Sequence, residues 1–171
     1  ILAIAGLYFL SDAEGIVMIF VFATLYGFGK TFFWPTTLGV VSEQCPKGGA
    51  LTLNAIAGIG MLAVGILGGP VIGKMTEDSI KASVEAASSE ETYQSVSKES
   101  TYFLGDYTAV DTEKVDALTD EKEQETIKES IQSGKQGSLA SIAIFPVFML
   151  LCYLGLIFHF KSKGGYKPVE I

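Results

Sequence analysis

Three apolar stretches, each long enough to cross a lipid bilayer, determine what this sequence of 171 residues can fold into. They cover residues 16–41, 50–73 and 139–160, and Lys30 is the only charged residue in any of them. A bilayer core about 30 Å thick requires about 20 apolar helical residues. A buried helix of a soluble protein is the alternative for each run, but three runs of this length in a short chain favour membrane spans. The sequence therefore predicts an all-α membrane protein.

A fourth apolar run, residues 1–10, is about half as long as a span requires. It has no basic start and no cleavage site, so it does not read as a signal peptide. We expect it to be the C-terminal half of a truncated transmembrane helix. Because the first residue is Ile1 rather than Met, we also expect the chain to be a fragment, whose partners include the missing N-terminal part and the lipid bilayer.

The net charge of −7 is concentrated in one segment. Residues 74–138 hold fifteen acidic residues and seven lysines, a net of −8, whereas the rest of the chain is nearly neutral and very apolar. We expect a long acidic loop, partly helical, with one or two polar helices within residues 110–131. A solvated insertion is the simplest interpretation of this loop; docking of a partner is the alternative.

Lysines near helix ends predict the orientation, because short cytoplasmic loops are enriched in positive charge. The tail, residues 161–171, carries three lysines and follows the last span, so we expect it to be cytoplasmic. Counting spans backwards places residues 42–49 inside, with Lys47, and residues 74–138 outside the cytoplasm. Loops longer than about 60 residues escape this rule, so the seven lysines of the acidic loop do not contradict it.

Composition and motifs exclude several function classes. A nucleic-acid partner is not expected, because the chain has no basic face. Cys45 and Cys152 are too few for a disulfide scaffold, and no metal-ligand or catalytic spacing occurs around the single His159, so we predict no metal, no cofactor and no enzyme activity. Gly29-Lys30-Thr31 imitates a phosphate-binding loop, but Thr24 stands where that motif requires glycine.

Lys30 lies near the middle of its predicted span and is the most informative residue of the sequence. A charge at this depth costs about 2.5–3.5 kcal/mol on insertion scales, so such a residue usually faces an aqueous cavity or a carboxylate. A role in binding substrate or coupling transport is therefore our first hypothesis. A structural ion pair with an acid elsewhere in the protein is the second.

Helical spacings of three and four residues place several chemically useful side chains on the face of Lys30. This cavity face combines a cation, hydroxyl groups and aromatic rings that suit sugar or nucleoside rings, and it comprises Tyr26, Lys30, Phe33, Trp34 and Thr37. Packing between helices is the competing interpretation of the aromatic residues.

Glycine and proline residues predict bends and close contacts in the first two spans. Bending or gating is expected at Gly27, Gly29, Pro35 and Pro70. Four-residue spacing, which lets helices pack backbone to backbone, occurs at Gly65, Gly69 and Gly73. The third span, 139–160, has few polar side chains and is expected to face lipid, with a kink at Pro146 in its second or third turn.

The segments GKTFFWPTTLGVVSEQCPKGGA, from Gly29 to Ala50, and GIGMLAVGILGGP, from Gly58 to Pro70, resemble the C-terminal end of bacterial major facilitator superfamily transporters. The resemblance implies twelve helices in two halves, of which this chain supplies the end of helix nine and helices ten to twelve of a partial bundle. It implies the bacterial inner membrane and alternating access to a midplane site. It also implies that residues 16–41 line the cavity; the long external loop departs from compact family members.

The function expected from these observations is secondary active transport of a small polar solute such as a sugar or nucleoside, coupled to protons or another ion. The spans hold no carboxylate, so a coupling acid would have to lie in the missing part. Two alternatives stay open. One is a small membrane-anchored protein whose acidic external region binds a partner. The other is a channel subunit that places Lys30 in a ring around a pore.

Overall fold

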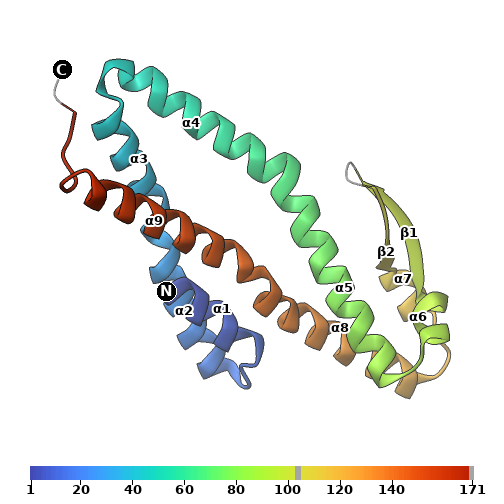
Figure 1. Cartoon of the computed structure of the whole chain (residues 1–171). Helices are drawn as coiled ribbons and strands as arrows, with labels where there is room; N and C mark the ends of the chain where they lie inside the picture. Colours follow the sequence, from blue (N-terminus) through green and yellow to red (C-terminus); the bar gives the residue numbers. More distant parts are fainter. Residues whose placement is uncertain (103–104, 170–171) are drawn as a thin grey trace. The chain divides into compact units, whose positions relative to one another are not determined.

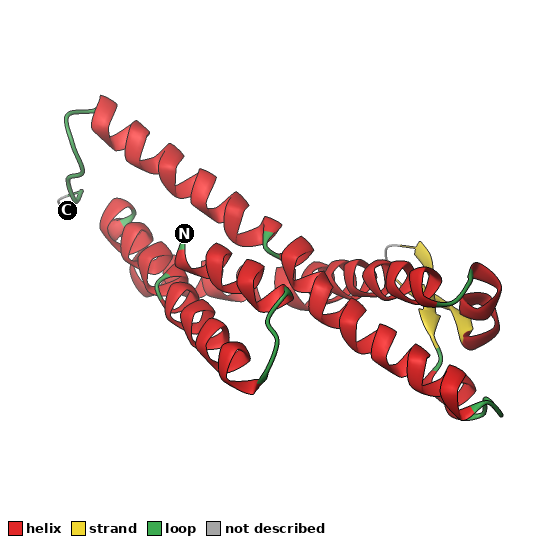
Figure 2. Ribbon diagram, turned by 90° about the horizontal axis from the view of Figure 1, so that it is seen from below, coloured by secondary structure: helices red, strands yellow, loops and turns green. Residues whose placement is uncertain are grey.

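The computed structural model describes residues 1–102 and 105–169 and is mostly helical (Figure 1). The chain divides into two compact units, one made of residues 1–65 and 143–171 and the other of residues 66–142. Within the described residues, strands occur only in one hairpin, as Figure 2 shows by colour. The two units are described separately below.

Only helices and short connections build the described part of the first unit. Its elements are α1 (Leu2–Ser11), α2 (Ile16–Thr31), α3 (Phe33–Gln44), the 3-10 turn η1 (Pro46–Gly48), α4 (Gly49–Ala63) and α9 (Ile144–Ser162).

Helices α1 and α2 form a hairpin whose backbones touch at glycines. A Cβ atom built on Gly29 would lie 2.3 Å from the backbone nitrogen of Ala3, and one on Gly6 would lie 2.6 Å from that of Tyr26. Any side chain at these positions would force the helices apart. Gly29, for which close approach and a bend were expected, lies at this close contact between the two helices.

The predicted span 16–41 is two helices, separated at Phe32 and ending at Gln44. Together they form one apolar stretch of 29 residues, long enough to cross a membrane. Pro35, the third residue of α3, lacks an N–H group and cannot donate to the carbonyl four residues earlier, which accounts for a new helix beginning here. The interruption lies within the stretch where a bend was expected.

The glycine-rich run also differs from its predicted bounds of 50–73. The helix begins at Gly49, passes through a π-helical turn, η2 (Val64–Gly68), and continues as α5 (Gly69–Ala87). Pro70 is the second residue of α5 and lies two positions after the end of η2. Proline removes a backbone donor and crowds the preceding turn, and such strain is a recognised cause of irregular helix geometry. The apolar helix therefore extends into the segment that was expected to be a loop, and no boundary occurs at Lys74.

Near the C-terminus, the predicted span 139–160 is divided between α8 (Glu121–Ile142) and α9, with Ala143 between them. Pro146 is the third residue of α9, and the interruption at Ala143, three residues earlier, lies in the part of the span where a kink was expected. Proline is tolerated in a first turn because the N–H groups there have no helical partner.

Residues 66–142 make a second unit around its own small core. Besides α5 and α8 it contains α6 (Glu90–Val96), β1 (Ser97–Tyr102), β2 (Gly105–Val110) and α7 (Thr112–Asp116). The fully buried side chains of the core come from four helices: Ile80, Val84, Tyr93, Val96, Val115, Ile127 and Ile131. Helices α5 and α8 pack so closely that a Cβ on Gly134 would lie 2.6 Å from the Cα of Ile80.

The antiparallel hairpin of β1 and β2 was not predicted. Its register pairs Ser97 with Val110 and Thr101 with Asp106. Side chains attach it to the core: Glu77 accepts a hydrogen bond from the backbone N–H of Val110 at 3.2 Å. The expected polar helices within residues 110–131 correspond to α7 and the first half of α8.

Large apolar side chains are exposed along the long helices. Ile16, Leu51, Met61 and Phe158, for example, are 71%, 79%, 74% and 67% exposed. Among the residues that the structure describes, three helical stretches are long and apolar enough to span a membrane, namely Ile16–Gln44, Pro46–Ala87 and Glu121–Ser162. Apolar surface of this extent is typical of helices that face lipid or other helices. The prediction of a membrane protein with transmembrane helices is confirmed at this level.

Candidate functional site

The residues of the predicted cavity face take part in three separate contacts. Lys30, in the last turn of α2, is exposed, and its ammonium lies 5.4 Å from the centre of the Tyr26 ring one turn earlier. That geometry is a cation–π contact, which is typically worth about 0.5–1 kcal/mol at exposed sites. Of the carboxylates that the structure describes, none lies within 4.0 Å of Lys30. The lysine thus has an aromatic neighbour and no counter-ion in this part of the protein.

Phe33 and Thr37 meet helix α9 through a small polar cluster. The Tyr153 hydroxyl donates to the carbonyl of Phe33 at 2.9 Å and lies 2.9 Å from the Thr37 hydroxyl. The Thr37 hydroxyl also lies 2.9 Å from that carbonyl and can donate to it. The rings of Phe33 and Tyr153 are 6.5 Å apart and tilted by 39°. Two hydroxyl groups and one carbonyl therefore fasten α9 to the start of α3.

Tyr153 was not among the predicted site residues, because its helix was expected to face lipid. The hydroxyl group of Tyr153 was the feature of the sequence that could have identified this residue. A tyrosine within an otherwise apolar span needs a hydrogen-bond partner, since an unpaired hydroxyl in hydrocarbon is unfavourable. The partner is on the very helix that carries the predicted site.

Trp34 turns toward a third neighbour, helix α4. A Cβ on Gly60 would lie 3.2 Å from the outer edge of the Trp34 ring, so the indole lies over this glycine. Trp34 remains 45% exposed. The contacts of Phe33 and Trp34 are both between helices, and the predicted role of these two residues in a cavity stays a prediction.

The remaining predicted glycines have open surroundings. Nothing in the described chain lies within 4 Å of a Cβ built on Gly27, Gly65, Gly69 or Gly73. The expected close packing at the last three has no partner among the described residues and stays a prediction. Gly27 has room for a side chain, in contrast to Gly29 two residues later.

A hollow of about 360 Å³ lies beside the Tyr153 cluster in the first unit. Helices α1, α2, α3 and α9 contribute to its wall, and its lining includes Gly29, Phe33, Thr36, Pro146 and Tyr153. The lining is mainly apolar with a few hydroxyl groups, the usual character of a small-molecule site. Lys30 is not among its lining residues.

No group of three or more metal-ligating side chains occurs among the described residues. Cys45 and Cys152 are both free and exposed. In the part of the chain that the structure describes, no such group therefore lies near Lys30.

The chain was compared with protein-family models, with curated proteins and with solved structures, and nothing matches it. The resemblance to transporters of the major facilitator superfamily therefore stays a hypothesis that rests on the quoted residues alone.

Proposed function

We propose that this chain is part of a secondary transporter that moves a small polar solute, such as a sugar or nucleoside, by alternating access. The proposal includes coupling to protons or another ion and a place in the bacterial inner membrane with the C-terminus in the cytoplasm. In this mechanism two halves of a helical bundle rock around a site near the bilayer midplane. Lys30 would contact the solute or a coupling carboxylate, and Tyr26 would form the aromatic wall beside it.

Lys30 is the observation that carries this proposal. A lysine without a nearby carboxylate, in an apolar helical stretch of 29 residues, is costly unless water, solute or a partner acid surrounds its ammonium. The adjacent Tyr26 ring supplies only part of that compensation. A transport cavity supplies the rest, because it is both hydrated and open to solute.

Two helix irregularities support the conformational part of the proposal. The stretch that carries Lys30 is interrupted at Phe32, and the next stretch contains the π-turn Val64–Gly68. Interrupted helices are common at the substrate sites of transporters, and π-turns are frequent at functional sites. Gating at Gly27, Pro35 and Pro70 is proposed on the same basis.

Uptake by the whole gene product that carries this chain tests the role of Lys30. Cells or proteoliposomes are given a panel of radiolabelled sugars and nucleosides, and any accumulated solute is then followed in Lys30→Ala and Lys30→Arg variants. We expect Lys30→Ala to reduce uptake at least tenfold at an unchanged amount of membrane-inserted protein, and Lys30→Arg to retain part of it. Lys47→Ala, in the loop after α3, serves as the matched control. Normal uptake by Lys30→Ala would remove Lys30 from the mechanism.

A second candidate function is favoured by the compact unit of residues 66–142. Its own core and its acidic composition suit an external module that docks a basic partner protein, with the apolar helices as an anchor. This function gives Lys30 no task. Replacing residues 88–120 by a short Gly-Ser linker discriminates the two, because transport through the membrane helices would survive it and partner binding would not.

A further inference from the structure

The C-terminal tail is fixed to the end of helix α3. The Tyr166 hydroxyl donates to Glu43 at 2.6 Å, the Gln44 side-chain amide donates to the carbonyl of Lys167 at 3.0 Å, and the Val169 N–H donates to the carbonyl of Glu43 at 2.9 Å. This contact raises the pKa of Tyr166, mainly through its hydrogen bond to Glu43. The tail therefore closes one end of the cleft between α3 and α9.

Two adjoining hollows occupy this cleft. The first, of about 510 Å³, has Gln44, Cys45, His159 and Lys163 in its lining. The second, of about 630 Å³, has Tyr153, Ile157 and Lys161 in its lining. Both share an apolar wall made of Val40, Leu156 and Phe160. The cleft thus combines an apolar interior with cationic side chains at the end where the spans finish.

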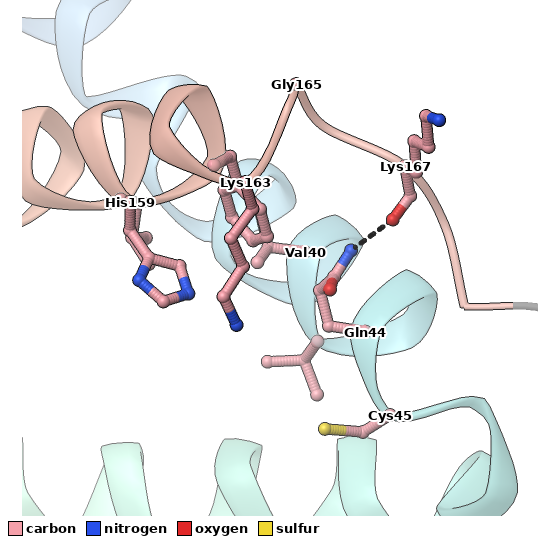
Figure 3. A pocket seen from close by; sticks show the side chains of 10 residues that line it. Val40, Gln44, Cys45, His159, Lys163, Gly165 and Lys167 are labelled. Atoms are coloured by element: carbon pink, nitrogen blue, oxygen red, sulfur yellow. Dashed lines mark hydrogen bonds between the residues drawn. The ribbon is translucent and has the colours of Figure 1, made fainter.

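Figure 3 shows how the polar side chains of the first hollow lie. The His159 ring and the Lys163 ammonium are both directed into the space, whereas the Lys167 ammonium points away from it. Of the carboxylates that the structure describes, none forms an ion pair with Lys161 or Lys163. Glu43, the acid of this region, already accepts the hydrogen bond from Tyr166.

We propose that the cleft between α3 and α9 binds an anionic phospholipid, with its phosphate beside the Lys163 ammonium in the first hollow and its acyl chains against Val40, Leu156 and Phe160. Charge complementarity selects this occupant: a basic pocket between membrane helices suits an anionic headgroup, and the apolar wall suits the chains. Lysines in a last helical turn also offset the helix dipole. Offsetting the dipole, however, requires neither an apolar cleft nor a tail that lines one end of that cleft.

Cys45 provides a site-specific test, because its thiol lies in the first hollow and is exposed. The whole gene product is alkylated in detergent with a maleimide, and the rate at each cysteine is followed by peptide mass spectrometry. We expect dioleoyl phosphatidylglycerol to slow modification of Cys45 and dioleoyl phosphatidylcholine to leave it unchanged. Cys152, also free and exposed, is the internal control.

Charge variants assign the effect to the cleft. Each lysine contributes about 1 kcal/mol to attraction of an anionic headgroup, or about fivefold in affinity. The half-protecting concentration of phosphatidylglycerol should therefore rise about fivefold in Lys163→Gln. It should stay near the wild-type value in Lys163→Arg and in Lys47→Gln, which removes a charge that lines neither hollow.

Three results would overturn the proposal. The first is equal protection of Cys45 by phosphatidylcholine, which would show that the headgroup charge is irrelevant. The second is protection by glycerol 1-phosphate alone, which would make the cleft a site for a soluble anion. The third is undiminished protection in Lys163→Gln. Should that variant fail to fold, Leu156→Trp, which fills the apolar wall, should abolish protection while Lys163 remains.

Discussion

At the scale of single residues, the hydroxyl cluster of Thr37 and Tyr153 shows how an apolar interface gains specificity. Both hydroxyls meet the carbonyl of Phe33, so neither is left unpaired in a hydrocarbon environment. A hydrogen bond between membrane helices is worth about 0.6 kcal/mol on average and about 1–2 kcal/mol in favourable cases. The cluster therefore fixes how α9 is rotated against α3 more than it adds to overall stability.

The phenylalanine variant of Tyr153 tests this contact. We expect Tyr153→Phe to lower stability by about 1 kcal/mol, because the donor to Phe33 and the partner of Thr37 are both lost. Thermal unfolding in detergent measures the change. Tyr8→Phe is the control, since Tyr8 is 58% exposed and lies on α1 rather than at the contact between α3 and α9. Equal effects of the two variants would show that the cluster is not formed in the protein.

At the scale of elements, the apolar runs could be predicted and their ends could not. Run length alone identifies Ile16–Gln44 as a span, since few other structures accommodate so many apolar residues. The extension of α5 to Ala87 escaped prediction because the segment was assigned from its acidic composition, although Ile80, Val84 and Ala87 recur at helical spacing and the first two are buried. The hairpin of β1 and β2 escaped for a related reason: its alternation is weak and its attachment runs through Glu77 and Tyr93.

Part of the candidate site could also be predicted from the sequence. The chemical character of Lys30 follows from charge and depth, and its neighbour Tyr26 follows from helical spacing. The partners of Phe33 and Trp34 do not follow, because they lie on α9 and α4, far away in the sequence. The distinction between Gly27 and Gly29 also depends on a neighbouring helix.

The difference between Gly27 and Gly29 gives a prediction for the packing of α1 against α2. We expect Gly29→Ala to separate the two helices and to lower the melting temperature by several degrees, because its Cβ would lie 2.3 Å from the backbone nitrogen of Ala3. Gly27→Ala should leave the melting temperature unchanged or raise it, since the position is open and alanine is the better helix former. The reverse order of the two variants would contradict the close contact.

At the scale of the whole molecule, the chain combines apolar helices with a polar unit that has its own core. The two units should therefore respond differently to solution conditions. Asp111 is an indicator for residues 66–142, because it caps α7 through the Glu113 N–H at 3.1 Å and pairs with Lys98 at 3.3 Å. Burial acts to raise the pKa of Asp111, but these hydrogen bonds and the nearby lysines hold it below 3.8.

The lowered pKa predicts how pH affects this unit. The ionised carboxylate contributes stability above pH 3.8, and the contribution is lost as the pH falls through the folded-state pKa. Hydrogen exchange around α7 should therefore be faster in Asp111→Asn than in wild type at pH 7. The two should converge as the pH falls through the lowered pKa of Asp111, because the wild-type carboxylate then becomes protonated. Asp106→Asn, on the same hairpin, is the control; a difference that persists at low pH would contradict the linkage.

The central claim is that Lys30 faces a hydrated transport cavity, and thiol accessibility tests it most directly. The native cysteines of the whole gene product are first replaced, and the Lys30→Cys variant is then treated with a charged, membrane-impermeant thiol reagent. Phe20→Cys serves as the lipid-facing control, because the side chain of Phe20 is 67% exposed on the same helix. We expect position 30 to react at least tenfold faster than position 20. Position 30 reacting as slowly as position 20 would place Lys30 outside any aqueous pathway and contradict the transport proposal.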